Sequence, residues 1–421
     1  MSKRRYSTVN CKQVDWAALA EAMAGERAVF AVDVAKVKFV AAVQVQAGKT
    51  LVRVRWQHPF ETAELLAGLA VLAEAGSVEV VMESSGVYGD ALRWQLHQRG
   101  IGVSRVEAKR VHDSAAVYDG VPSLHDAKAT ELIAKLHWEG CSVRWEPLPE
   151  ARRDQLAQVR RLRQAKARVQ AERSRLDALL ARHWPELPHR LGLSSASLLR
   201  LVATYGGPAA LTLLGHQARR LLREVGGHLL AEETIDAVLA SARTTLGMPC
   251  TAGESAQLRW QAEQLIAAQR EQRQAERQLV RAIPADDALT PMYAVIGQLT
   301  SAVLLATQGN PKDYPDAASY CKGIGLNLKE HSSGQHQGQL AITKRGPSLA
   351  RFYLYFAALR LIRRDPVIKR WYAIKTARPG AVKQKQVIEL MRKLAKAFWH
   401  QANGHTFDVN RLVNLKAVAG A

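Results

Sequence analysis

The first third of the chain alternates short apolar runs with segments of helical spacing. Residues 28–34 form an apolar run, and 38–45 and 51–57 continue as two further runs of this kind. Apolar residues at helical spacing follow over 61–75, and another β-branched run covers 77–82. Short β-branched runs predict strands, and apolar residues three and four positions apart predict helices. Strands that alternate with helices over about 140 residues predict an α/β domain with a mixed sheet.

After residue 149 the pattern changes to long amphipathic helices. Residues 150–183 combine many arginines and glutamines with apolar residues at helical spacing, which predicts one long helix with a basic face. Residues 255–283 repeat the pattern and end before Pro284, because proline stops a helix. Two such helices with shorter helices between them predict an antiparallel coiled-coil arm with a helical insertion at its tip. A plain helical bundle is the alternative.

The last part of the chain is mixed but mainly helical. Helical patterns cover 292–307, 347–364 and 384–402, and a segment rich in Gly, Ser and Gln at 323–346 has the composition of a loop. These shifts predict four parts along the chain. They are an N-terminal arm at 1–25, an α/β domain at 26–148, the helical arm at 149–284 and a mainly helical C-terminal domain at 285–421.

The composition indicates a polyanionic partner. The chain has 421 residues with 59 Lys and Arg against 38 Asp and Glu, which gives a formal net charge of +21. So large a surplus repels itself unless a polyanion neutralises it, and nucleic acid is the usual polyanion. A basic protein without such a partner is the alternative. We therefore expect nucleic-acid binding that weakens as the salt concentration rises.

Cysteine spacing and hydropathy exclude several other classes of protein. The four cysteines are far apart and form no Cys-x-x-Cys pair, so neither a zinc site nor a disulfide framework is predicted. No apolar run approaches the roughly 20 residues of a membrane span. The basic start, Met1 to Tyr6, lacks the apolar stretch of a signal peptide. The expected location is the bacterial cytoplasm, in association with the nucleoid.

Three carboxylates stand in unusual sequence contexts. Asp33 lies in an apolar strand, Glu83 ends a second strand, and Asp126 comes directly before a predicted helix. An acidic side chain in an apolar strand is costly unless it is paired or binds a cation. Carboxylates from two strand ends and a helix start could converge on one or two Mg²⁺ ions, which favours a ribonuclease-H-like arrangement. Taken singly, Asp33 would also suit a turn, Glu83 a surface ion pair and Asp126 a helix N-cap.

Several segments are similar to those of one transposase family. Three contain the carboxylates, namely Ala-Val-Asp33-Val-Ala-Lys, Met-Glu83-Ser-Ser-Gly-Val-Tyr and His-Asp126-Ala-Lys-Ala-Thr-Glu-Leu. They resemble the N-terminal RuvC-like domain of the insertion-sequence 110 family of transposases. The segment Gly-Ile-Gly-Leu-Asn-Leu-Lys-Glu-His-Ser-Ser333-Gly, with those at 342–347 and 353–360, resembles the family's C-terminal transposase domain. The resemblance looks closest to the subgroup of insertion sequence 1111.

The resemblance implies a set of four acids. In the family this set is Asp-Glu-Asp-Asp, and its last two members are spaced Asp-x-x-Asp and usually followed by Ala. Asp33 and Glu83 match the first two. If Asp126 is the fourth acid, which the Ala after it favours, the third position is Ser123; in the other register Asp126 is the third acid and Ala129 occupies the fourth position. One acid is missing in either register, so the chain is a three-acid enzyme, a weakened natural copy or an inactive engineered variant.

The resemblance also implies a serine nucleophile. Ser333 matches the family's serine in a Ser-Gly setting, and Ser332 beside it is a second candidate. A serine hydroxyl is a weak nucleophile without a base or metal nearby, and without the family a solvated loop serine would be the simpler interpretation. The implied mechanism has the carboxylates bind Mg²⁺ while Ser333 attacks a DNA phosphate and holds a covalent link. It places acids and serine in one composite site across protomers of a dimer or tetramer, guided by a structured non-coding bridge RNA.

Basic residues are dense in the C-terminal part. Residues 329–396 contain 16 Lys and Arg against 3 Asp and Glu. Such residues neutralise phosphates. The predicted nucleic-acid contacts are Lys344, Arg345, Arg351, Arg363 and Arg364. Two other functions stay open, a RuvC-like nuclease that hydrolyses branched DNA without a serine intermediate and a nucleic-acid-binding protein with a decayed site.

Overall fold

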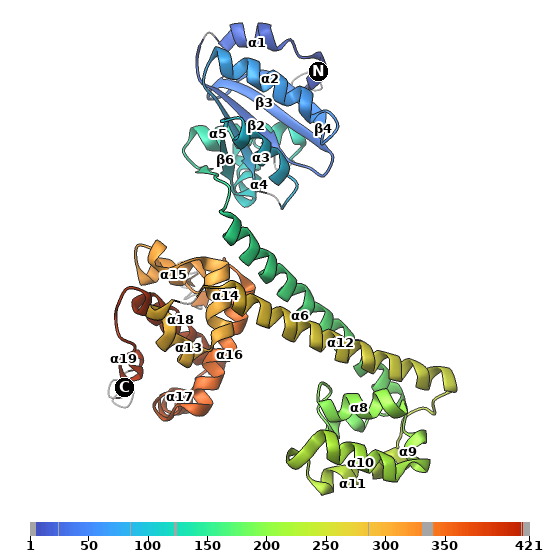
Figure 1. The fold of residues 1–421 in the computed structure, drawn as a ribbon. Helices are drawn as coiled ribbons and strands as arrows, with labels where there is room; N and C mark the ends of the chain where they lie inside the picture. Colours follow the sequence, from blue (N-terminus) through green and yellow to red (C-terminus); the bar gives the residue numbers. More distant parts are fainter. Residues whose placement is uncertain are drawn as a thin grey trace. The chain divides into compact units, whose positions relative to one another are not determined.

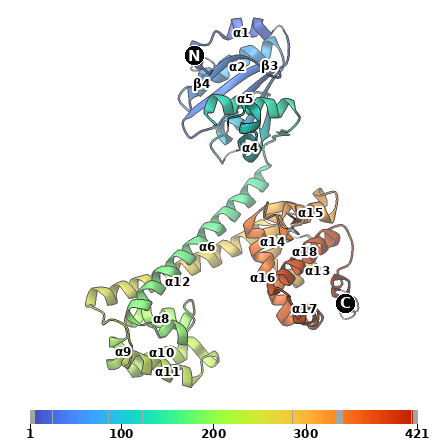
Figure 2. The same ribbon diagram turned by 180° about the vertical axis from the view of Figure 1, so that it is seen from behind.

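The computed structural model divides into two compact units, residues 1–149 and 150–421 (Figures 1 and 2). The structure describes residues 6–23, 25–84, 86–121, 124–284, 286–330, 340–413 and 415.

Unit 1 is built on a mixed sheet with the strand order β1-β4-β3-β2-β5-β6-β7. The predicted first three strands form an antiparallel meander, in which β3 lies between β2 and β4. β5 and β6 follow on the other side of β2, and all three run parallel. The strands are β1 (Val9–Asn10), β2 (Ala28–Asp33), β3 (Lys38–Gln46), β4 (Lys49–Gln57), β5 (Val78–Glu83), β6 (Gly102–Val106) and β7 (Val143–Arg144). The predicted mixed α/β domain is confirmed, and it is consistent with a RuvC-like fold.

Helices cover both faces of this sheet (Figure 1). They are α1 (Trp16–Met23), α2 (Thr62–Ala75), α3 (Asp90–Gln98), α4 (Ala108–Asp119) and α5 (Asp126–Trp138), with a short 3-10 helix η2 (Cys11–Gln13). Successive side chains of a strand point to opposite faces. Phe30 and Val32 therefore pack with α1, α2 and α3, whereas Val29 and Ala31 pack with α4 and α5. The sheet is thus the middle layer of three.

Residues 9–23, which the sequence assigns to an N-terminal arm, pack into unit 1. Val9 pairs with Val54 of β4 in parallel register. Cys11, Leu19 and Met23 are buried in the same core as the apolar side chains of α2, and both α1 and η2 pack against α2. The α/β core therefore begins well before residue 26.

Two long helices of unit 2 run antiparallel to each other. They are α6 (Glu150–His183) and α12 (Ala252–Ala282). Gln261 donates to the Glu172 carboxylate at 2.7 Å, and Arg168 lies 2.8 Å from the Glu271 carboxylate. A contact earlier in α6 is thus made with a residue later in α12, which shows that the two helices run in opposite directions. The two long helices agree with the sequence pattern, and their coiled-coil packing stays a prediction.

Shorter helices between α6 and α12 form the predicted insertion and have a core of their own. They are α7 (Leu187–Arg190), α8 (Ala196–Tyr205), α9 (Ala209–Leu213), α10 (Gly215–Gly226), η3 (Gly227–Leu229) and α11 (Glu232–Arg243). Leu176 and Leu180 of α6 share this core with Leu258 and Leu265 of α12. The insertion is therefore anchored on both long helices.

The C-terminal part of unit 2 is mainly helical, as predicted. Its elements are η4 (Asp287–Leu289), α13 (Thr290–Ile296), α14 (Gln298–Gln308), η5 (Pro311–Asp313), α15 (Ala317–Gly323), β8 (Leu328–Lys329), β9 (Ala341–Ile342), α16 (Ser348–Arg364), α17 (Pro366–Ala377), α18 (Lys383–Ala402) and α19 (Val409–Leu412). Leu162 of α6 and Leu279 of α12 share a core with Met292 and Leu354. The long helices and the C-terminal helices therefore form one packed body.

No single helix within the described ranges is long and apolar enough to cross a membrane. α13 and the segment Gln298–Asp313 pass that test only as a pair bent by 113°. Their side chains Met292, Ile296 and Leu304 are buried in the core of unit 2.

Candidate acidic active site

Asp33 and Glu83 are the last residues of two neighbouring parallel strands. Val32 of β2 pairs with Met82 of β5, so the next residues of both strands lie side by side at the same edge of the sheet. Side chains alternate along a strand, and Asp33 and Glu83 therefore point to the face on which Val29, Ala31 and Val81 pack. This is the face covered by α4 and α5. The fold thus brings two of the predicted acids together.

Asp126 is the first residue of α5, the helix that packs across β2 and β3 on this same face. Its neighbour His125 is the N-cap, because the His125 ring accepts a hydrogen bond from the backbone N–H of Lys128 at 3.2 Å. Asp126 is therefore not the capping residue, and its exposed side chain stands at the helix start. Asp126 is thus the first residue of the helix, whereas the sequence pattern places it directly before the helix.

The three carboxylates lie close enough to repel one another electrostatically. Burial first, and then the charges of Glu83 and Asp126, raise the pKa of Asp33 to about 6. No group of three or more His, Cys, Asp and Glu side chains within the described ranges is close enough to hold a metal ion. The acids thus share one electrostatic neighbourhood without forming a closed ligand set. Oxygen donors that disfavour each other's charge are chemically suited to a hard divalent cation.

The vacant fourth position stays open between two residues. Ser123 lies outside the described residues. Ala129 is buried in α5, one helical turn beyond Asp126. Both registers of the four-acid set therefore remain predictions.

Comparison with known proteins covers both ends of the chain. A transposase family model of the DEDD type from insertion sequence 110 matches residues 30–185, which include all three carboxylates. A second model, described as the transposase IS116/IS110/IS902 family, matches residues 293–373. The chain belongs to this transposase family. Its subgroup is not decided by these matches.

One relative of this family member is a protein of Streptomyces coelicolor described as insertion element IS110 uncharacterized 43.6 kDa protein. The two sequences are 27% identical over 245 residues, which is 57% of this chain. The matched part spans 60% of the relative, less than two thirds of its length.

A buried lysine that the sequence did not single out holds the start of α5 in this transposase-family domain. Lys128 is 2% exposed, and its Nζ donates to Asp119 at 2.7 Å and to the carbonyl of Val121 at 2.6 Å. These contacts tie α5 to the C-terminal end of α4. The residue stands two positions after Asp126, so it fixes the segment from which that acid projects. The sequence could have indicated its role only through its position, because Lys128 is a charged residue among the small residues Ala127 and Ala129.

A second polar contact fastens α5 to the sheet. Arg53 of β4 forms an ion pair with Glu131 of α5, and Tyr118 of α4 donates to the other Glu131 oxygen at 2.9 Å. Glu131 is 6% exposed. The helix that carries Asp126 is therefore held from both β4 and α4.

The candidate nucleophiles Ser332 and Ser333 lie outside the described residues. The two short strands on either side of that segment pair in antiparallel register, with Leu328 opposite Ile342 and Lys329 opposite Ala341. The described residues thus place the base of a hairpin in unit 2.

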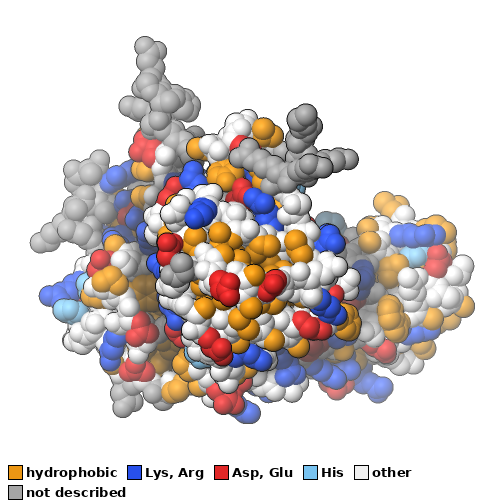
Figure 3. Space-filling model, turned by 90° about the horizontal axis from the view of Figure 1, so that it is seen from above, with side chains coloured by type: hydrophobic (Ala, Val, Ile, Leu, Met, Phe, Trp, Pro, Cys, Tyr) orange, Lys and Arg blue, Asp and Glu red, His pale blue; other side chains and the backbone are white. Residues whose placement is uncertain are grey.

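The predicted nucleic-acid contacts differ in their surroundings. Lys344, Arg345, Arg363 and Arg364 are exposed. Arg351 is half-buried and donates to the carbonyls of Ile324 and Gly346 at 3.0 and 2.9 Å, and burial lowers its pKa. Fewer of its donors are left for phosphate. Figure 3 shows lysine and arginine side chains spread over the visible surface, with acidic side chains among them.

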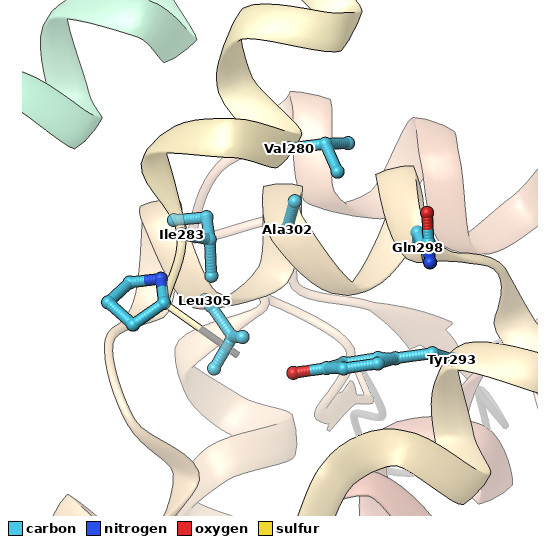
Figure 4. Close-up of a pocket in the computed structure, with 7 residues that line it drawn as sticks. Val280, Ile283, Tyr293, Gln298, Ala302 and Leu305 are labelled. Atoms are coloured by element: carbon cyan, nitrogen blue, oxygen red, sulfur yellow. The ribbon is translucent and has the colours of Figure 1, made fainter. Parts of the chain in front are cut away.

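An apolar pocket of about 150 Å³ lies between the end of α12 and the helices α13 and α14 (Figure 4). Val280, Ile283 and Leu305 line it together with Tyr293 and Gln298. No acidic or basic side chain lines it, so it offers no contact for phosphate. This pocket is therefore not a candidate site for binding or cutting DNA.

Proposed function

We propose that the protein is a DNA transposase that cuts and rejoins DNA at the ends of an insertion element and at a target. The observation that carries the proposal is that the transposase match at 30–185 contains all three carboxylates of one electrostatic neighbourhood. The match at 293–373, which spans the C-terminal hairpin and its basic residues, supports it. The net charge of +21 suits a DNA substrate.

We propose Mg²⁺ as the cofactor and Asp33, Glu83 and Asp126 as its ligands. Burial and the neighbouring charges of Glu83 and Asp126 raise the pKa of Asp33, and a bound cation would relieve both effects, which supports this role. When bound, Mg²⁺ would offset the negative charge that develops on the reacting phosphate. The chain's own part is to hold the three carboxylates in place through the register of β2 and β5 and through the anchored start of α5.

We propose Ser333 as the nucleophile, with Ser332 as the second candidate. The bond from the serine Oγ to phosphorus forms as the bond from phosphorus to the leaving strand oxygen breaks. The proton of the serine hydroxyl ends on that leaving oxygen. A strand end then reverses the step with its own hydroxyl, which rejoins DNA and restores the serine.

We also propose a structured guide RNA, assembly as dimers or tetramers, and action on the nucleoid in a bacterial cytoplasm. The proposed coiled-coil arm offers a surface for nucleic acid. Four exposed arginines lie on one face of α12 and line a shallow groove of about 320 Å³. They are Arg270, Arg273, Arg277 and Arg281. Arginine recognises phosphate oxygens with two parallel hydrogen bonds.

The test is a strand-exchange assay with the purified protein, the RNA that co-purifies with it, Mg²⁺, and DNA of the element and its target. We expect joined products, loss of them in Asp33→Asn, and retention in Asp113→Asn, an exposed acid of α4. A covalent protein–DNA adduct should vanish in Ser333→Ala and persist in Ser332→Ala. Cleavage without an adduct would instead favour a RuvC-like nuclease, and DNA binding without cleavage a decayed protein.

The vacant acid position has its own pair of variants. Ser123→Asp and Ala129→Asp each complete the four-acid set in one register. We expect strand exchange to rise in Ser123→Asp alone, because the alanine after Asp126 favours that register. A rise in Ala129→Asp alone would assign the other register.

A further inference from the structure

Two hollows adjoin on one side of α18 in unit 2. The first, of about 460 Å³, lies between the base of the β8–β9 hairpin and α18. The second, of about 430 Å³, lies between the C-terminal half of α18 and residues 405–412. Lys393 and Lys396 line both hollows. The two hollows therefore form one continuous depression along the helix.

The exposed side of α18 carries a stripe of basic residues along this depression. Lys385, Arg392 and Lys396 follow one another at steps of seven and four residues, which keeps them on one face of a helix. The opposite face, with Leu390 and Leu394, is buried in the core. From Lys385 to Lys396, the last lysine of the helix, the stripe is about 17 Å long, at 1.5 Å per residue. Arg411 of α19 continues it. We call Lys385, Arg392, Lys393, Lys396 and Arg411 the α18 track.

Two acidic side chains line the hollows, and each has an interaction partner in unit 2. Glu389 lies 3.1 Å from Lys375, and Asp408 caps α19 by accepting from the backbone N–H of Asn410 at 2.9 Å. Within the described ranges, no residue of the α18 track forms an ion pair with a carboxylate. The Nε of Arg392 is buried and has no hydrogen-bond partner in the described part of the chain. The five basic side chains of the track therefore face three carboxylates, those of Glu389, Asp408 and the Asp316 that interacts with Lys396, and the concave surface keeps a net positive charge.

Two histidines lie at the end of the track. The rings of His400 and His405 lie 5.3 Å apart and line the second hollow. Burial, His405 and Lys396 all lower the pKa of His400, which disfavours the charged form of its ring. The charge of the second hollow comes from the lysines and Arg411.

We infer that the α18 track binds the phosphodiester backbone of one nucleic-acid strand. A row of cations about 17 Å long matches several phosphates in series, whereas a small anion would occupy only one hollow. Lysines act as point charges on phosphate, and arginines add directed hydrogen bonds. Contacts of this kind position a strand and do not read its sequence. The inference rests on the proposed function, because it takes a nucleic acid as the partner. DNA and RNA offer the same backbone chemistry.

The test compares salt dependence of binding between two matched double variants of the full chain. Lys393→Gln/Lys396→Gln removes two charges of the track. Lys312→Gln/Lys369→Gln removes two exposed lysines of the same unit outside both hollows. The probes are a DNA duplex of mixed sequence and an RNA duplex of the same sequence and length. We expect the slope of log affinity against log salt to fall by about 2 in the track variant and to stay unchanged in the control.

Equal slopes in both variants on both probes would overturn the inference. A loss confined to one probe identifies the strand as DNA or as RNA. Circular dichroism and a melting curve check that each variant folds, and Lys385→Gln/Arg411→Gln, which alters two exposed ends of the track, repeats the test if Lys393→Gln/Lys396→Gln unfolds. Binding is measured without strand exchange. If the track variant loses binding but the wild-type protein never joins DNA, the inference about the track holds and only the proposed function is contradicted.

Discussion

Lys128 anchors the start of α5, the helix whose first residue is Asp126. It is 2% exposed and has the Asp119 carboxylate at 2.7 Å. A buried charge without its partner is costly, because the protein interior cannot replace the lost solvation. The chain offers a natural comparison on α4, the helix that carries Asp119, where Lys109 and Asp113 form an exposed pair at 2.7 Å.

We predict that Asp119→Ala lowers the free energy of unfolding by about 3 kcal/mol, because Lys128 stays buried without its carboxylate. Asp113→Ala should change it by less than about 1 kcal/mol, since an exposed pair contributes little. Urea unfolding of the full chain at pH 7, followed by circular dichroism, measures both. Equal losses in the two variants would mean that Lys128 is not held by an essential pair.

At the scale of elements, the sequence predicts the strands better than it predicts the contacts between elements. β2 and β5 are visible because strands buried on both faces leave continuous apolar runs, and both end on an acid. The sequence places Asp126 just outside α5 because residues 126–129 mix polar and small residues, whose burial depends on α4 and the sheet. The α18 track is invisible for the same reason, since its first hollow joins residues 328 and 396, which only folding brings together.

The start of α12 allows a sharp test at this scale. The Thr251 hydroxyl accepts from the backbone N–H of Glu254, and the Glu254 carboxylate accepts from the backbone N–H of Thr251. Removing such a cap costs about 1 kcal/mol, because backbone donors lose their partners. We predict this loss for Thr251→Ala and recovery of most of it in Thr251→Ser, measured by urea unfolding. No difference between the two variants would show that the capping box does not stabilise α12.

At the scale of the whole molecule, the candidate acids and the candidate serine belong to different compact units. Asp33, Glu83 and Asp126 lie in unit 1, whereas the hairpin that flanks Ser333 belongs to unit 2. A single catalytic centre made from both requires that unit 1 of one chain meets unit 2 of the same chain or of another. The resemblance to the transposase family implies the second arrangement, and oligomer symmetry would then create equivalent composite sites.

Mixing two inactive variants distinguishes these arrangements. Asp33→Asn lacks an acid and Ser333→Ala lacks the nucleophile, so each alone should form no joined DNA under the proposed function. If acids and serine act across protomers, mixed oligomers of the two variants contain one site with an intact acid set from one chain and an intact serine from the other. We therefore expect strand exchange to return in the mixture and to depend on the mixing ratio. If all sites lie within one chain, every chain in the mixture is defective, and the mixture stays as inactive as its parts although the wild type remains active.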